Sequence, residues 1–191
     1  MHGRTRRIAM AAVAGIASIT VATAVAATKD KAFSTGNFSA SVPDEGVAVK
    51  SLNVKTKGTI KDVNAFVGLD ITFNGDYALY LMHPSGKTIH LSSNNGGSGN
   101  GYGSGGCAGA VEFDDEAMLE IDSFEGVDKT FFNEDSYQPE EVDTNGLGGL
   151  EDLDGKKLNG KWKLIASDTT EFSGGTLECF KLEVEYKTPS N

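Results

Sequence analysis

Three adjacent carboxylates, Asp114, Asp115 and Glu116, are the residues best suited to chemistry in this chain. Adjacent negative charges repel one another, so a folded protein either spreads them into solvent or shares a cation among them. Calcium takes six to eight hard oxygen ligands in a flexible geometry, and a loop rich in carboxylates can supply several of them. We therefore expect Ca²⁺ at this turn, with Asp114 and Asp115 as ligands; the alternative is a solvated acidic turn.

Two further aspartates occupy positions where a loop could present an oxygen ligand. Asp76 follows Gly75 at a turn, and Asp168 ends a predicted strand that begins near Trp162. We regard both as secondary candidates for calcium ligation. An aspartate that hydrogen-bonds its own turn would explain either position equally well.

The chain offers little material for nucleophilic catalysis. Apart from His2, its histidines are His83, in a Pro-Ser-Gly turn, and His90, in a short predicted strand. A Ser-His-Asp site is recognised by geometry, and no sequence pattern here places a nucleophile beside a base. We therefore expect no catalytic residues and no enzymatic activity.

A glycine-rich segment runs from Asn94 to Gly106. Its spacing Gly101-x-Gly103-x-x-Gly106 formally matches a dinucleotide fingerprint, but no helix follows and no βαβ unit surrounds it. The segment is interpreted as a mobile surface loop. Four aromatic residues are expected to be exposed enough to form a binding surface, and they are Tyr102, Phe131, Phe132 and Tyr137, whereas Trp162 alternates with Leu164 and is expected in the core.

The elements that must position these residues are short strands. Apolar residues occupy every second position from Val63 to Phe73, and again from Phe180 to Tyr186, which is the period of half-buried strands. Leu177 and Cys179 have the opposite parity to Phe180, so a β-bulge is expected there. Turn dipeptides separate the strands, and no segment has a convincing helical period. The pattern predicts an all-β jelly-roll sandwich.

The first 26 residues have the layout of a secretory signal peptide. Arg4, Arg6 and Arg7 precede an uncharged, Ala-rich stretch that ends in a small-x-small site at residues 24–26. A transmembrane anchor is the alternative, because the uncharged stretch approaches the length of about 20 residues that spans a bilayer. Residues 27–40 are expected to form a flexible segment before the domain, and 188–191 a short tail.

Without the three arginines, the chain carries 14 lysines against 27 acidic residues, a formal charge of −13. Such a charge should repel nucleic acid and anionic lipid, so neither is an expected partner, whereas cations should be attracted. The only cysteines, Cys107 and Cys179, are expected to form a structural disulfide if the chain is exported. Closing a loop of about 70 residues contributes roughly 3–4 kcal/mol in the loop-entropy account.

Six short motifs, in order, resemble the P domain (Homo B domain) that follows the catalytic domain of subtilisin-like proprotein convertases. They are Gly75-Asp76-Tyr77-Ala78-Leu79-Tyr80-Leu81, Pro84-Ser85-Gly86, Gly96-Gly97-Ser98-Gly99-Asn100, Phe113-Asp114-Asp115-Glu116-Ala117, Tyr137-Gln138-Pro139-Glu140 and Asn159-Gly160-Lys161-Trp162.

The resemblance implies a P domain over residues 40–187, with a jelly-roll fold like that of galactose-binding domains and with bound calcium. It also implies a role in stabilising or recognising a protease, while no catalytic domain is expected within this chain. We therefore expect an exported, non-catalytic protein, periplasmic or extracellular, whose partner is a protein such as a secreted protease. A free-standing module that binds a surface protein or a glycan is the alternative.

Overall fold

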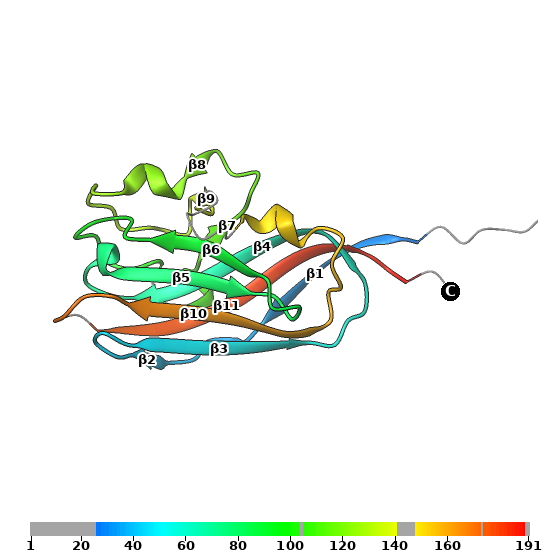
Figure 1. The fold of residues 1–191 in the computed structure, drawn as a ribbon, viewed down its shortest axis with the longest axis horizontal. Coiled ribbons are helices and arrows are strands. Elements are labelled where there is room, and N and C mark those ends of the chain that lie inside the picture. Colours follow the sequence, from blue (N-terminus) through cyan, green and yellow to red (C-terminus); the bar gives the residue numbers. More distant parts are fainter. Residues whose placement is uncertain (1–25, 104, 141–147, 173, 190–191) are drawn as a thin grey trace, which may run out of the picture.

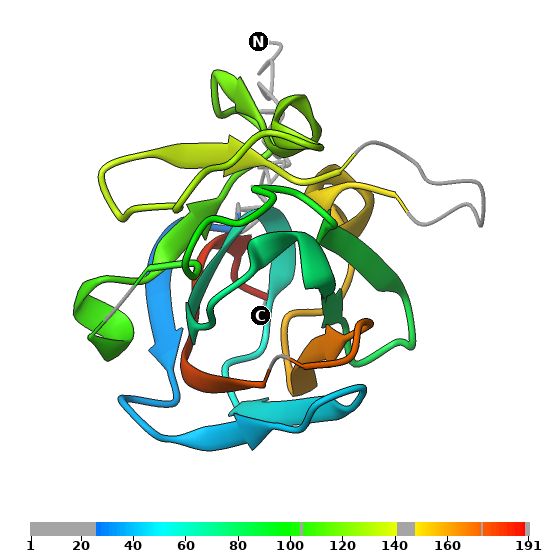
Figure 2. The same cartoon turned by 90° about the vertical axis from the view of Figure 1, so that its left-hand side faces the viewer.

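A computed structural model describes residues 26–103, 105–140, 148–172 and 174–189. Two β-sheets lie face to face, and a continuous set of buried apolar side chains fills the space between them (Figure 1). Seen from one end, the strands wrap around this shared interior and the loops fold across it (Figure 2). The prediction of an all-β sandwich is confirmed.

The larger sheet has the strand order β1-β11-β4-β7-β9-β8, and β2 pairs with β11 beside this path. Its pairings are antiparallel except for those of β9 with β7 and with β8. Its strands are β1 (Thr28–Ser34), β2 (Ala40–Val42), β4 (Thr59–Asp70), β7 (Val111–Phe113), β8 (Leu119–Glu120), β9 (Ser136–Gln138) and β11 (Gly175–Lys187).

The smaller sheet is antiparallel and has the order β3-β10-β5-β6. Its strands are β3 (Val47–Val54), β5 (Tyr77–Met82), β6 (Thr88–Ser93) and β10 (Gly160–Asp168). Helical structure in the described residues is limited to short 3₁₀ turns, namely η1 (Asn74–Asp76), η2 (Gly106–Ala108), η3 (Ile121–Phe124) and η4 (Leu150–Leu153). None of the helices in this part of the chain is long and apolar enough to cross a membrane.

The period-2 alternation buries one face of each central strand. In β4, Val63, Ala65 and Val67 are buried and the residues between them are partly exposed, as the sequence predicts. Trp162 of β10 is fully buried, and its indole Nε1–H donates to the carbonyl of Leu158 at 3.0 Å. A buried indole therefore keeps its hydrogen bond, which confirms Trp162 as a core residue.

The predicted bulge and disulfide are both present. The pairing of β11 with β4 shifts register between Leu177 and Cys179, so both Cys179 and Phe180 are buried although their parities differ. Cys107, in η2, is bonded to Cys179, with 4.9 Å between their Cα atoms. The bond ties the end of the glycine-rich segment to the centre of the larger sheet.

The prediction of a flexible segment over residues 27–40 does not hold for Thr28 to Ser34. Residues Thr28 to Ser34 form β1, which pairs antiparallel with β11 from Lys187 back to Lys181. Most side chains of β1 are exposed, so the segment lacks the apolar alternation by which strands are recognised. Its order comes from the backbone ladder along the edge of β11, which depends weakly on side-chain type. The predicted signal peptide lies outside the described residues but for Ala26.

The prediction that four aromatic residues are exposed is wrong for three of them. Tyr102, Phe131 and Tyr137 are fully buried, whereas Phe132 is 52% exposed. The glycine-rich segment is therefore part of the core packing. Gly101 and Gly103 have φ of +85° and +72°, and the backbone between them pairs Tyr102 with Leu69 of β4, with N···O distances of 2.8 and 3.0 Å. Left-handed turns on both sides direct the tyrosine inward.

Candidate metal site

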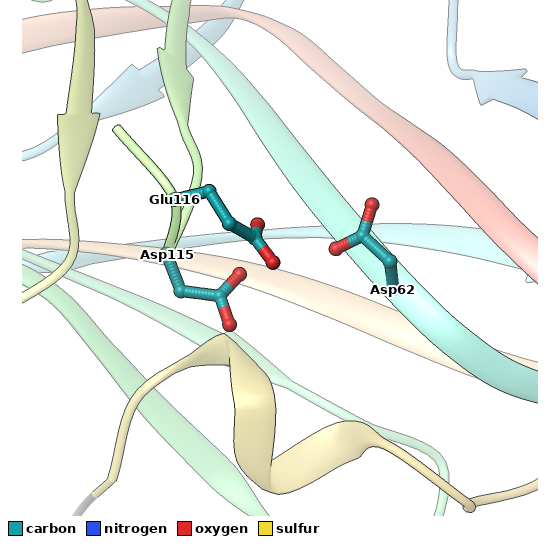
Figure 3. Close-up of side chains that lie close together, drawn as sticks. All are labelled: Asp62, Asp115 and Glu116. Atoms are coloured by element: carbon teal, nitrogen blue, oxygen red, sulfur yellow. The ribbon is translucent and has the colours of Figure 1, made fainter. Parts of the chain in front are cut away.

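Three carboxylates come together beside the larger sheet. Asp62 projects from β4, and Asp115 and Glu116 project toward it from the turn that follows β7 (Figure 3). One oxygen from each carboxylate can be chosen so that all three lie within 4.8 Å of one another. We call these three residues the carboxylate cluster.

The turn after β7 is held by its own backbone and by Asp114. The amide of Asp114 donates to the carbonyl of Tyr137 at 3.0 Å, and the amide of Ala117 donates back to the Asp114 carbonyl at 3.2 Å. The Asp114 carboxylate accepts the Glu116 amide at 2.9 Å. Phe113, fully buried, anchors the start of the turn, so Asp115 and Glu116 are presented toward β4.

The cluster holds more negative charge than its surroundings favour. Burial and the Asp115 charge raise the pKa of Asp62, and burial together with nearby carboxylates raises the pKa of Asp115. A side-chain hydrogen bond to Asp114, then burial and the neighbouring charges, raise the pKa of Glu116 to about 7. The Asp115 Oδ1 atom is buried and has no hydrogen-bond partner in the described residues. A cation placed among these oxygens would relieve the repulsion.

The donor set suits calcium. Three neighbouring carboxylates, one of which holds an oxygen without a partner, supply hard ligands that Ca²⁺ accepts in irregular geometry. Backbone carbonyls or water would supply the remaining positions of a six- to eight-coordinate ion. No histidine or thiol takes part, so the set is less suited to zinc.

The predicted ligands fall into two places. Asp115 belongs to the carboxylate cluster, whereas the Asp114 side chain is turned to the Glu116 amide. Asp76 and Asp168 lie at one end of the smaller sheet, where Thr169 donates its amide and its hydroxyl to the Asp76 carbonyl, each at 2.8 Å. The Asp168 carboxylate accepts the Thr170 amide at 3.2 Å, an aspartate-turn contact. The four residues therefore do not form one site.

Asp62 is the member of the cluster that sequence reasoning missed. Asp62 occupies one of the polar positions that alternate with the buried residues of β4, and the residues next to it in the sequence do not resemble a ligand motif. The pairing of β4 with β7, which sets Ala65 opposite Phe113, brings Asp62 near a turn more than 50 residues away. Glu116 belongs to the acidic run, but the sequence pattern does not single it out as a ligand.

His83 and His90 occupy packed positions. The His83 ring meets Trp162 edge to face at 4.7 Å between centroids, its Nε2 lies 3.0 Å from the Lys157 carbonyl, and its Nδ1 accepts the Ser85 amide at 3.0 Å. Burial lowers the pKa of His83. His90 stacks on Tyr80 at 4.8 Å, and its Nδ1 lies 3.5 Å from a Glu140 carboxylate oxygen.

Comparison with known proteins supports the fold and leaves the family open. No family model matches the chain, and no curated protein matches it. Among solved structures, the serine protease of Aeromonas sobria is similar with a TM-score of 0.52 and 14% identity, over 85% of this chain and 28% of that chain. The same protease in complex with its chaperone matches with the same values. This chain thus spans little more than a quarter of either solved chain, and at this identity the likeness concerns the fold.

Proposed function

We propose that this chain is an exported, non-catalytic module that stabilises or recognises a serine protease of the subtilisin type and is itself stabilised by calcium. One observation supports the protease association most directly. The two-sheet sandwich superimposes on part of a serine protease chain that is more than three times as long as the matched region. The order of the six motifs agrees with this, because the P domain that they resemble accompanies proteases of that class.

The non-catalytic role is supported by the surroundings of the polar side chains. His83 is bound to a backbone carbonyl and a backbone amide of neighbouring turns, which is the arrangement of a ring that stabilises a turn. A base in a hydrolytic site needs one ring nitrogen free to take a proton from a nucleophile. The Ser85 hydroxyl lies 2.8 Å from His83 Nδ1, but that nitrogen already accepts the Ser85 amide.

Calcium would be held by Asp62, Asp115 and Glu116. Bound there, the ion would neutralise the repulsion between β4 and the turn after β7 and would join two segments that contact each other through a three-residue pairing. Such a site is expected to stabilise the turn and, through Phe113, the buried rings of Tyr102, Phe131 and Tyr137, which we call the aromatic cluster.

A genetic experiment tests the association with a protease. In the source organism, the gene is deleted, and the decay of phenylmethylsulfonyl-fluoride-sensitive casein hydrolysis in the exported fraction is followed at elevated temperature. We expect faster decay in the deletion strain, recovery with the restored gene, and weaker recovery with Asp62→Asn. An unchanged half-life after deletion would show that the module does not stabilise an exported serine protease. Purified chain should neither hydrolyse casein nor react with a fluorophosphonate.

A further inference from the structure

The two ends of the sandwich differ in charge. At one end lie the loops 43–47, 70–76 and 168–172, which are linked by backbone hydrogen bonds from Asp168 to Gly46 and from Thr169 to Asp76, at 2.9 and 2.8 Å. This end is on the left in Figure 1 and faces the viewer in Figure 2. These loops contain no lysine or arginine, and their acidic residues are Asp44, Glu45, Asp70, Asp76, Asp168 and Glu171. We call this end the acidic tip.

The acidic tip also exposes apolar side chains. Phe172 is 93% exposed, Val47 is 55% exposed and Phe73 is 48% exposed. Phe172 has φ of +77°, in the left-handed region where a residue with a side chain is strained. A strained backbone that holds an aromatic ring in solvent gives nothing to the core, and such a ring is typical of a residue that packs against a partner.

The opposite end carries the complementary features. There the loops 55–58, 83–87 and 155–161 meet, with Leu158 donating to the Gly58 carbonyl at 3.0 Å and the His83 ring reaching the Lys157 carbonyl. Their lysines are Lys55, Lys57, Lys87, Lys156, Lys157 and Lys161, and the carboxylates nearby include Glu151, Asp152 and Asp154 of the preceding turn. One of the lysines, Lys87, is paired with Asp152 at 2.8 Å.

Between the loops 83–87 and 155–161 lies a pocket of about 380 Å³ with mainly apolar walls. It is lined by His83, Pro84, Ser85, Gly155, Lys156, Lys157 and Asn159, and we call it the lysine pocket. The Lys156 charge adds to burial in lowering the pKa of His83, in keeping with a positive potential. Strand β10 runs from Gly160 beside the pocket to Asp168 at the acidic tip, so the two features are about 25–30 Å apart.

We propose that the acidic tip of one copy docks into the lysine pocket of a second copy, with the Phe172 ring in the pocket. An exposed apolar ring on an acidic tip matches an apolar pocket with Lys156 and Lys157 in its wall, so both burial and charge favour this pairing. An anionic membrane surface suits the tip less well, because its carboxylates would be repelled by the lipid headgroups.

The contact joins two different surfaces and is therefore heterologous. A head-to-tail contact of this kind leaves one acidic tip and one lysine pocket unoccupied at the two ends of the assembly. Association therefore continues beyond the dimer unless the copies close into a cyclic oligomer. The interaction is expected to be weak, because one aromatic side chain and its rim bury less area than a permanent interface. This self-association is independent of the proposed function, and its test requires no protease.

Sedimentation velocity of the protein expressed from the full sequence tests the proposal. At low ionic strength, the mean mass should rise steadily between about 10 and about 500 µM and pass that of a dimer. At about 0.5 M NaCl the rise should be much smaller, since the charges around the contact are screened. A monomer at every concentration, or association that stops at a dimer, would overturn the proposal.

Two variants separate the two halves of the contact. Phe172→Ser removes the ring and keeps the pocket, while Lys156→Glu/Lys157→Glu reverses the pocket charge and keeps the tip. Each variant alone should remain monomeric, and an equimolar mixture should form a one-to-one dimer and nothing larger. Self-association of either variant alone, or no dimer in the mixture, would refute the head-to-tail arrangement.

Matched controls exclude general effects of the substitutions. Phe132→Ser removes an exposed ring outside the acidic tip, and Lys163→Glu/Lys181→Glu makes the same change in net charge outside the lysine pocket. Both controls should associate like the unmodified protein, and all variants should unfold within a few degrees of it. If Phe132→Ser lost association as fully as Phe172→Ser, the Phe172 ring would not be specific to the contact. The same comparison applies to the two double lysine variants.

Discussion

Calcium binding by the carboxylate cluster makes a quantitative prediction about stability. A ligand present at about 100 times its Kd adds about 2.7 kcal/mol to the free energy of unfolding. In a domain of this size, each kcal/mol raises the unfolding midpoint by about 2–4 °C. With about 1 mM CaCl₂ and a Kd of about 10 µM, we therefore expect the midpoint to rise by about 5–10 °C relative to EGTA, whereas MgCl₂ should have much less effect.

The pH dependence of this shift follows from the Glu116 carboxyl. Its pKa is raised to about 7, so calcium must displace a proton that this group retains at lower pH. The sign of the pH effect follows from the linkage between proton binding and folding. The folded protein without calcium binds more protons than the unfolded chain between the ordinary glutamate pKa and about 7, so its stability falls as pH rises through this window. The calcium-induced shift should accordingly be larger at pH 8 than at pH 6.

Substitutions in the cluster and outside it identify the ligands. Asp115→Asn should abolish the calcium response and, at pH 8 in EGTA, raise the unfolding midpoint, because it removes a charge whose pKa burial and neighbouring carboxylates raise. Asp62→Asn should behave in the same way. Asp76→Asn should keep the full response, as should Glu134→Gln at an exposed position. The assay is differential scanning calorimetry.

Two results would refute this reasoning. A midpoint that is the same in calcium and EGTA at pH 8 would show that the cluster is plain acidic surface. A response that survives Asp115→Asn but is lost in Asp76→Asn would place the ion at the smaller sheet. The second result would keep calcium as a ligand and overturn the assignment of residues.

Three further predictions concern stability. Replacing both cysteines by serine should lower the free energy of unfolding by roughly 3–4 kcal/mol, measured by urea denaturation, and a loss under about 1 kcal/mol would contradict the loop-entropy account. Phe131→Ala should lower the free energy of unfolding by about 3–5 kcal/mol because Phe131 is fully buried, whereas Phe132→Ala should change it by less than about 1 kcal/mol. Equal effects of the two substitutions in the same assay would contradict the burial of the aromatic cluster. His83 has a lowered pKa because its ring is buried, so it binds fewer protons when folded and destabilises the fold as pH falls below about 6.5. The thermal unfolding midpoint of His83→Gln should therefore fall less between pH 7 and pH 5 than that of the unmodified protein. An equal fall in both proteins would show that His83 does not contribute.

Much of the fold could be predicted from local patterns. The alternation around Val63 and Trp162 identifies buried faces, because a strand that covers a core must alternate apolar and polar side chains. The opposite parities of Leu177 and Phe180 likewise predict the bulge, and two cysteines behind a predicted export signal predict the disulfide. Each of these features is encoded within a few residues or by a single pair.

The tertiary structure alone decided which distant segments meet. The alternation of β4 marks Asp62 as outward-facing, but only the pairing of β4 with β7 sets it beside Asp115 and Glu116. Glycine-rich turns direct Tyr102 into the core although its neighbours are polar and small, and β1 is ordered by the edge of β11 without an apolar pattern. Likewise, the acidic tip and the lysine pocket each gather loops far apart in the chain. A local pattern specifies which face of a strand is buried, whereas the partner and register of that strand depend on packing over the whole sandwich.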